Sequence, residues 1–391
     1  METTWVNPYN EGVTSIGVNN TKKGKGGNRI MKRFVVLVLA VSILLMNFAV
    51  SFAAGVDVGI VLPTKDEPRW LQDRARFEDV IKATPYSVEV LFSQGSSAAE
   101  KTNVETLIAK GAKVIIICAH DAAAAGIAVE NAKAEGITVI SYDRLITGTD
   151  ALDYYVTFDS VSVGEAMGEY LVKNATGAGN PLYLYAGALT DNNAFLFFQG
   201  AWNILQPKIA DGTFVIKNSA QALALKDTKN LTREQQAAII GEITTDWDMN
   251  VAKSKAEAHL TSVGAADKGQ VYILAPNDGT SRSIADVFAA DTDVSKYFIT
   301  GQDAEKASVQ YIIDGRQSMT VFKDTRTLAS DAMNMAIDIL QGKEPATDTF
   351  YDNTMIQVPA KQSPVVIVTR DNVKAVLIDS GYYSAGDFTG L

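Results

Sequence analysis

The sequence predicts a two-lobed α/β fold in which helices cover both faces of parallel β-sheets. Three observations lead to this prediction. From residue 56 onward, short apolar runs alternate with helix-length amphipathic segments. Several of the runs are continuously apolar, which is typical of strands buried on both faces. The alternation then starts again near residue 182, so the 391 residues divide into two lobes of similar build.

The first series predicts four strands and three helices. Strands are expected at 56–62, 87–92, 114–118 and 138–142, and helices at 71–82, 98–110 and 122–135. Gly111 and Gly136 directly follow two of the helical patterns, at the position where many helices end in a left-handed residue. Each glycine is soon followed by the next strand, in the order that a βαβ unit requires.

The second series repeats this order. Strands are expected at 182–185, 214–217, 270–274 and 297–300, and helices near 194–209, 249–263, 281–290 and 304–314. A further apolar run spans 319–322. The polar stretch 218–233 predicts a surface excursion, and no shorter repeat or low-complexity tract is present.

The composition argues against several classes of protein. Residues 1–53 carry six basic and two acidic side chains, which leaves a net charge of −14 on the rest of the chain. Because this part of the chain is so acidic and has no cluster of Lys and Arg, it would repel the phosphate backbone of nucleic acid. Cys118 is the single cysteine and ends an apolar run, so we interpret it as a buried core residue. With only His120 and His259 in the chain there is no Cys/His metal framework, and no metal or cofactor is expected.

The N-terminal region predicts export. Met31-Lys32-Arg33 is a basic start, the next fifteen residues are almost entirely apolar, and Ser51-Phe52-Ala53 places small residues at −3 and −1. We therefore interpret residues 31–53 as a signal peptide, with Ala54 first in the mature chain. A membrane anchor is the competing interpretation, since the apolar stretch is barely long enough to span a bilayer. No cysteine stands at the cleavage site, which argues against lipid attachment. Residues 1–30 are expected to be untranslated or a disordered extension.

Polar side chains gather directly after the predicted strands. In open parallel sheets, ligands bind beyond the carboxyl ends of the strands, so these residues are the first candidates for a site. Asp, Asn and Arg suit sugar hydroxyls, each of which both donates and accepts hydrogen bonds. Aromatic faces can pack on the C–H face of a pyranose. The strand-end groups are Arg69-Trp70, His120-Asp121, Asp143-Arg144, Asp191-Asn192-Asn193, Asn277-Asp278, Gln302-Asp303 and Lys323-Asp324, with Trp247 in a loop before a helix.

Each of these groups also has a purely structural interpretation. Asp143-Arg144 can be an ion pair at the rim of a sheet, and Asp121 can be an ordinary helix N-cap. Trp70 can be a core residue, and His120 can be a polar neighbour rather than a ligand or base. The cluster Asp191-Asn192-Asn193 exceeds what one cap needs, and the joint placement of all the groups favours a binding site.

At these motifs the chain resembles the periplasmic sugar-binding proteins of the ribose, galactose and xylose group. The resemblance is strongest to the multiple-monosaccharide and D-xylose receptors, and it covers nearly all of residues 56–384. The matching motifs are Arg69-Trp70, Ser141-Tyr142-Asp143-Arg144-Leu145-Ile146, Thr157-Phe158-Asp159, Asp191-Asn192-Asn193-Ala194-Phe195, Asn277-Asp278-Gly279, Gly301-Gln302-Asp303-Ala304, Phe322-Lys323-Asp324-Thr325-Arg326 and Gly381-Tyr382-Tyr383.

The resemblance implies a type I periplasmic-binding fold, in which two Rossmann-like parallel-sheet lobes are joined by a three-segment hinge. The crossovers would lie near Asp159, near Lys323 and near 351–356. The N-terminal lobe would then comprise 54–159 and 324–352, and the C-terminal lobe 160–323 and 353–391. By motif match, the implied sugar contacts are Arg69, Trp70, Asp121, Asp143 and Arg144 from the first lobe, Asp191, Asn193, Trp247, Asn277 and Asp303 from the second, and Lys323 at the hinge.

The resemblance also implies a function. Proteins of this group capture a monosaccharide by hinge closure and deliver it to the permease of an ABC importer, sometimes with signalling to a chemoreceptor or sensor kinase. We expect an extracytoplasmic monomer that binds an aldohexose or aldopentose such as galactose, glucose, arabinose or xylose. Three departures from the family pattern bear on the preferred sugar: the loop Ala119-His120-Asp121, the length of 218–246, and Arg282 where small residues are common.

Three other functions remain as alternatives. A glycoside hydrolase needs two carboxylates about 5–10 Å apart, but the carboxylates here adjoin Asn or Arg, and no nucleophile elbow, phosphate loop or His-based dyad is present. A sugar-responsive transcription regulator of this fold needs a helix-turn-helix where the signal peptide stands. A purely sensory receptor would carry the same binding residues as a transport protein.

Overall fold

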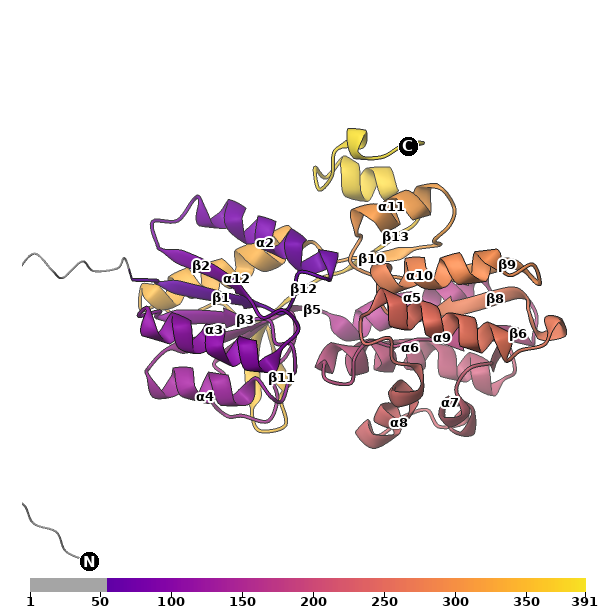
Figure 1. The fold of residues 1–391 in the computed structure, drawn as a ribbon, viewed down its shortest axis with the longest axis horizontal. Helices are drawn as coiled ribbons and strands as arrows, with labels where there is room; N and C mark the ends of the chain where they lie inside the picture. Colours follow the sequence, from indigo (N-terminus) through magenta and orange to yellow (C-terminus); the bar gives the residue numbers. More distant parts are fainter. Residues whose placement is uncertain (1–54) are drawn as a thin grey trace, which may run out of the picture. The chain divides into compact units, whose positions relative to one another are not determined.

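The structure is a computed structural model that describes residues 55–391. The chain from Ala54 onward forms one compact unit. The predicted signal peptide at 31–53 and the extension before it lie outside the described residues. Within those residues, two separate sheets of parallel strands flanked by helices confirm the predicted α/β class (Figure 1).

The first sheet has seven strands in the order β11-β12-β5-β4-β3-β1-β2. All neighbours are parallel except β11 and β12, which form an antiparallel pair. The central strands β1 and β3 are buried along their whole length, as expected when helices cover both faces. The strands are β1 (Val58–Leu62), β2 (Val88–Phe92), β3 (Val114–Ile117), β4 (Thr138–Tyr142), β5 (Tyr154–Phe158), β11 (Thr349–Asp352) and β12 (Gln357–Ser363).

Two helices cover each face of this first sheet. One face is packed by α2 and α12, through residues such as Phe77 and Leu328. The other face is packed by α3 and α4, through residues such as Leu107 and Val129. The helices are α2 (Pro68–Ile81), α3 (Ser97–Ala109), α4 (Gly126–Ala134) and α12 (Thr325–Leu340).

The second sheet has four parallel strands in the order β7-β6-β8-β9, and a separate antiparallel pair joins β10 to β13. One face is packed by α5, α6 and α8, and the other by α9 and α10. The strands are β6 (Asn180–Leu184), β7 (Phe214–Ile216), β8 (Gly269–Leu274), β9 (Val294–Ile299), β10 (Thr320–Phe322) and β13 (Val366–Val368). The helices are α5 (Ser160–Asn174), α6 (Asn192–Ala210), α7 (Ala220–Ala224), α8 (Arg233–Ile243), α9 (Met249–Thr261), α10 (Asp278–Ala290) and α11 (Lys306–Ile313).

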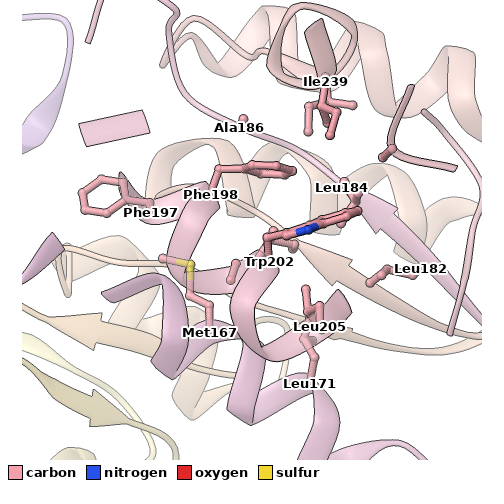
Figure 2. Close-up of a cluster of buried hydrophobic side chains, with 14 of the residues drawn as sticks. Met167, Leu171, Leu182, Leu184, Ala186, Phe197, Phe198, Trp202, Leu205 and Ile239 are labelled. Carbon is pink, nitrogen blue, oxygen red and sulfur yellow. The ribbon is translucent and has the colours of Figure 1, made fainter. Parts of the chain in front are cut away.

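Helices α5 and α6 approach each other backbone to backbone. A Cβ at Gly164 would stand 1.9 Å from the carbonyl oxygen of Phe197, and a Cβ at Gly200 would stand 2.0 Å from that of Val161. Only glycine fits at these two crossing points. The close approach lets large aromatic residues of α6 fill the core between the helices and the sheet, and Figure 2 shows Phe198 beside Trp202, whose rings are stacked at 5.8 Å. The first part of α6, which carries site residues, is therefore firmly anchored.

The chain passes between the two sheets three times. It leaves the first sheet after β5 at Asp159, returns through Lys323 and Asp324 into α12, and leaves again between β12 and β13. From the resemblance, residues 353–391 are expected in the second lobe. Strand β12 pairs with β5 in the first sheet, so that boundary moves to Ser363. The physical reason is that β12 reads QVPAKQS, which is too polar to stand out as an apolar run.

Two long helices, α5 and α12, were not predicted from the sequence. Each directly follows a crossover, and each begins at an Asp N-cap, Asp159 and Asp324. The polar stretch 218–233 contains the short helix α7 and connecting segments. Among residues 55–391, no helix combines the length and the apolar character needed to cross a membrane.

Candidate functional site

A narrow cavity with about 20 Å³ of water-accessible volume lies where strands of both sheets end. Ten of the eleven predicted site residues line it, and Asp121 does not. The lining comes from the loops after β1, β4, β6, β8, β9 and β10, from the first turns of α2 and α6, and from the loop before α9. The lining residues are Glu67, Arg69, Trp70, Asp143, Arg144, Asp191, Asn193, Phe197, Trp247, Asn277, Gln302, Asp303 and Lys323.

A row of ion pairs crosses the cavity and is centred on Arg69. Its Nη1 donates to Asp303 Oδ1 at 3.0 Å, and its Nη2 donates to Asp143 Oδ2 at 3.0 Å. Lys323 Nζ lies 2.8 Å from Asp303 Oδ1 and extends the row. Arg69 and Asp143 belong to the first lobe and Asp303 to the second, so the row joins the two lobes.

The guanidinium of Arg69 is also hydrogen-bonded to a buried carboxylate, Asp73, which was not predicted as a site residue. Asp73, one turn further along α2, accepts hydrogen bonds from Nε and Nη2 of Arg69 and from the hydroxyl of Tyr142. Asp73 is completely buried. Its contacts fix the plane of the guanidinium, and two of the three remaining N–H groups point to Asp143 and Asp303.

A second set of polar contacts joins the lobes beside this row. Arg144 Nε lies 3.0 Å from Asp191 Oδ2, and the same guanidinium lies 3.3 Å from Glu67. Asn193 Nδ2 donates to the backbone oxygen of Asp143 at 2.9 Å. Asp143-Arg144 is therefore not a rim ion pair, because the two residues bond to different partners inside the cavity.

Two site residues also cap helices. Asp191 Oδ1 accepts from the backbone N–H of Asn193 at 2.8 Å and caps α6, which leaves Oδ2 for Arg144. Asn277 Oδ1 accepts from the backbone N–H of Thr280 at 3.2 Å and caps α10. The capping and binding interpretations of these residues are thus compatible, because each side chain has a second polar atom.

Three cavity residues have left-handed backbones. Asp143 has φ 61°, Trp247 has φ 61° and Asp303 has φ 97°. Such angles are uncommon for residues other than glycine, cost of order 1–3 kcal/mol and persist where surrounding contacts enforce them. At Asp143 the enforcing contacts are a hydrogen bond from its N–H to Val156 and one from the Tyr155 hydroxyl to its carbonyl.

The aromatic residues form two walls. Trp70 lies in the core beneath the first sheet and also faces the cavity, with the Arg144 guanidinium 4.9 Å from its ring centre. Trp70 is therefore a core residue that also borders the cavity, and its contact with a sugar stays a prediction. Trp247 meets the edge of Phe197 at 6.4 Å and rests on Gly187, where a Cβ would come within 2.0 Å of the indole.

The structure does not bring Asp121 into the cavity. Its Oδ1 accepts from the backbone N–H groups of Ala123 and Ala124 at 3.0 and 2.9 Å. The turn that these bonds stabilise precedes α4, which begins at Gly126 rather than at residue 122. The expected sugar contact at Asp121 therefore has no support from its position: the carboxylate stabilises its own turn, and the N-cap of α4 is Ala125.

Three further lining residues were not among the predicted sugar contacts. Glu67 directly precedes α2, Gln302 directly precedes Asp303, and Phe197 follows Asn193 by one helical turn. The i to i+4 spacing on α6 is the signal that finds Phe197, because both side chains then lie on one face. Glu67 and Gln302 carry no signal beyond their position next to a strand end.

The electrostatics keep the central acceptor ionised. Burial alone raises the pKa of Asp143, but the nearby charges of Arg69, Lys323 and Arg144 outweigh it and hold that pKa below its usual range. Asp143 is therefore a carboxylate at neutral pH and accepts hydrogen bonds only. Within residues 55–391, no group of three or more His, Cys, Asp or Glu side chains has metal-binding geometry. The arrangement suits an uncharged ligand rich in hydroxyl groups.

Comparison with known proteins places the chain among binding proteins. Residues 58–344 match the sequence profile of the family described as periplasmic binding protein domain. The multiple sugar-binding periplasmic protein SbpA of Azospirillum brasilense is 33% identical over 341 residues, which cover 85% of this chain and 90% of that protein. The multiple sugar-binding periplasmic receptor ChvE of Rhizobium radiobacter is 33% identical over 368 residues, which cover 91% and 99%.

Solved structures agree with this placement. A carbohydrate transporter solute-binding protein of Chloroflexus aurantiacus, in complex with D-glucose, is 67% identical with a TM-score of 0.85, and the match covers 86% of this chain and 99% of that one. An ABC transporter solute-binding protein of Clostridium phytofermentans with bound β-D-glucose is 32% identical with a TM-score of 0.75, covering 84% and 99%.

Proposed function

The chain belongs to the family of periplasmic binding proteins, and from that premise we propose that it captures a monosaccharide between its lobes and delivers it to an ABC importer. Among aldoses we propose D-glucose first. The observation that carries the proposal is the row Asp143, Arg69, Asp303 and Lys323, in which charged groups of both lobes meet across one cavity. The site of action is outside the cytoplasm.

The row is suited to ring hydroxyls. A hydroxyl that enters beside Arg69 accepts from the guanidinium and donates to Asp143 or Asp303. Each ion-pair contact that it displaces is thus replaced by a charge-assisted hydrogen bond. Because nearby cations hold the pKa of Asp143 low, binding at neutral pH needs no proton uptake at this carboxylate.

Selectivity follows from the cost of unpaired groups. Asp143, Asp303 and Lys323 are each about 95% buried. A sugar epimer that points a hydroxyl away from one of them leaves a buried polar group without a partner, at a cost of ~1–3 kcal/mol. Trp70 and Trp247 would then limit the ligand to one with flat apolar C–H faces, as in a pyranose.

Hinge closure is the proposed mechanism. Arg69 and Asp143 come from the first lobe, whereas Asn193, Asn277 and Asp303 come from the second. A ligand that bonds to both sets has a higher affinity for the closed form and shifts the population toward it. The importer would recognise the closed form.

The choice of D-glucose rests on two similar solved proteins that hold it. The Chloroflexus protein, at 67% identity, is the stronger support, because substitutions in a lining are fewer at that similarity. The relatives SbpA and ChvE are named multiple sugar-binding proteins, so galactose, arabinose and xylose belong in the same test.

Calorimetry tests this proposal. The mature chain, residues 54–391, is unfolded and refolded to remove carried-over sugar and then titrated with D-glucose, D-galactose, L-arabinose and D-xylose. We expect one-to-one binding of micromolar strength for one or more of them, about −8 kcal/mol. Asp143→Ala and Asn277→Ala should abolish it, whereas Asp121→Ala, outside the cavity, should bind as the wild type does. A folded, stripped sample that gives no heat with any of the four sugars refutes the proposal.

Uptake by cells tests delivery separately. Loss of this protein should reduce import of the labelled sugar that calorimetry identifies, and plasmid-borne wild type should restore import where Asp143→Ala does not. Unchanged import in cells without the protein would contradict delivery and favour the purely sensory role.

A further inference from the structure

The motif Gly381-Tyr382-Tyr383 is not part of the sugar cavity, yet its two tyrosines are ordered by many contacts. Tyr382 is 4% exposed and meets Phe322 of β10 edge to face at 4.6 Å. Tyr383 meets Tyr382 at 4.8 Å and Phe388 at 5.5 Å. Together with residues of α11 and β13 they form a small core of the second lobe.

The same tyrosines contact helix α2 of the first lobe. Gln72 Nε2 donates to the Tyr383 hydroxyl at 3.1 Å, and Gln72 Oε1 accepts from the Tyr382 hydroxyl at 3.3 Å. The Tyr382 ring also lies 5.0 Å from each of two guanidinium groups, Arg76 of α2 and Arg326 of α12. The C-terminal motif therefore joins the lobes outside the cavity.

A further hydrogen bond connects the motif to the binding site. The Tyr383 hydroxyl donates to the backbone oxygen of Ala304 at 2.9 Å. Ala304 follows Asp303, and both have left-handed backbones, with φ 49° and 97°. Two consecutive residues in that region need outside support, and the Tyr383 hydroxyl supplies part of it.

Helix α2 thus reaches this turn by two routes. Arg69 donates to Asp303 inside the cavity, and Gln72, three residues along the same helical face, reaches Ala304 through Tyr383. We propose that Tyr382 and Tyr383 form a latch between α2 and the Asp303 turn, and that Tyr383 is a positioning residue that holds Asp303 in place for the sugar. This inference rests on the proposed function.

The latch predicts a loss of affinity without loss of any sugar contact. Tyr383→Phe removes the hydroxyl and keeps the ring in its aromatic cluster. One net hydrogen bond corresponds to about a 5-fold change in an equilibrium constant. We expect D-glucose, or the aldose that wild type binds best, to bind about 5-fold more weakly. The loss should appear in a faster dissociation rate in stopped-flow tryptophan fluorescence.

Tyr297→Phe is the matched control. The Tyr297 hydroxyl also donates to a backbone oxygen at 2.9 Å, that of Arg316, but both residues belong to the second lobe. This variant should lose stability to a similar degree and keep the wild-type affinity and dissociation rate. A merely structural role of Tyr383 would make the two variants alike.

A double-mutant cycle with Gln72→Leu completes the test, and Gln72→Leu alone replaces Tyr383→Phe if that variant does not fold. If the two residues act through one link, the double variant loses no more affinity than the more affected single variant. Wild-type affinity in both single variants, or additive losses, overturns the latch and leaves the proposed function intact. If the wild type binds no aldose, that result contradicts the proposed function and, with it, the latch.

Discussion

Gly187→Ala adds a single methyl group beneath the Trp247 indole. A Cβ at residue 187 would stand 2.0 Å from Cζ2 and 2.2 Å from Cη2 of that ring. Non-bonded carbon atoms need about 3.5 Å, so the ring must move by roughly 1.5 Å. It has little freedom to do so, because the Trp247 backbone is already at φ 61° and the ring packs edge-on against Phe197. The displacement should therefore carry the ring into the cavity that it lines.

The expected magnitude follows from overpacking. Extra methyl groups in a packed site cost ~1–3 kcal/mol. If closure on the sugar needs Trp247 in its present position, that cost falls on the bound form, and affinity drops by about 5- to 150-fold. Calorimetry on the refolded chain measures the affinity, and denaturant unfolding measures how much of the cost falls on the fold.

Gly241→Ala is the control for the Gly187→Ala substitution. Gly241 lies inside α8, where an added Cβ meets nothing within 4 Å. Alanine is up to ~1 kcal/mol more favourable than glycine within a helix, so this variant should be equally or more stable and bind normally. Trp247→Ala provides the second check, since Gly187→Ala should cost nothing further in that background. Wild-type affinity in Gly187→Ala would show that the Trp247 ring does not need its present position for binding.

Three further predictions concern pH, the hinge and export. Burial raises the pKa of Glu100 to about 7 and lowers that of His259 to about 4. Between pH 4.5 and 7 folded Glu100 keeps a proton that the unfolded chain has lost, so its contribution to stability falls as pH rises, by up to ~1.4 kcal/mol per pH unit. Between pH 4 and 6.5 the unfolded chain protonates His259 and the folded chain does not, so that contribution rises with pH. In urea unfolding, the stability at pH 7 relative to pH 5 should therefore be higher in Glu100→Gln than in the wild type. In His259→Gln it should be lower than in the wild type. Equal pH dependence in all three proteins contradicts both assignments. Lys323→Met removes the ammonium group that lies 2.8 Å from Asp303 and should weaken sugar binding at least ~30-fold. As a control, Lys217→Met, whose partner Asp267 is exposed, should bind sugar as the wild type does in the same titration. The exported protein should begin at Ala54 by intact mass, and a mass that retains 31–53 would favour the membrane anchor.

The fold class was largely predictable because short, continuous apolar runs between helical segments are typical of parallel strands buried on both faces. The run 114–118 is apolar without interruption, since helices cover both faces of its strand. Strand β12 escaped prediction for the opposite reason. It is the second strand from the edge of the first sheet, beside β11, and four of its seven residues are polar. A polar strand at a sheet edge resembles a loop in sequence.

The site was predictable where chemistry and topology coincide. Asp143, Asn277 and Asp303 each follow a strand, and the parallel sheets bring their strand ends to one cavity. Asp121 also follows a strand, but its carboxylate bonds to its own turn, and sequence position does not distinguish these two outcomes. Asp73 was not found, because its role depends on the distance between a helix and Tyr142. Such contacts arise only when the elements are packed together.

A crystal structure of the refolded mature chain with D-glucose would show directly whether the sugar is captured between the lobes. We expect one sugar molecule in the cavity that Arg69, Asp143, Asn277 and Asp303 line. Its hydroxyls should lie within about 2.7–3.2 Å of Asp143 and Arg69 on the first lobe and of Asn277 and Asp303 on the second. A sugar bound to one lobe alone, or outside this cavity, would contradict capture between the lobes.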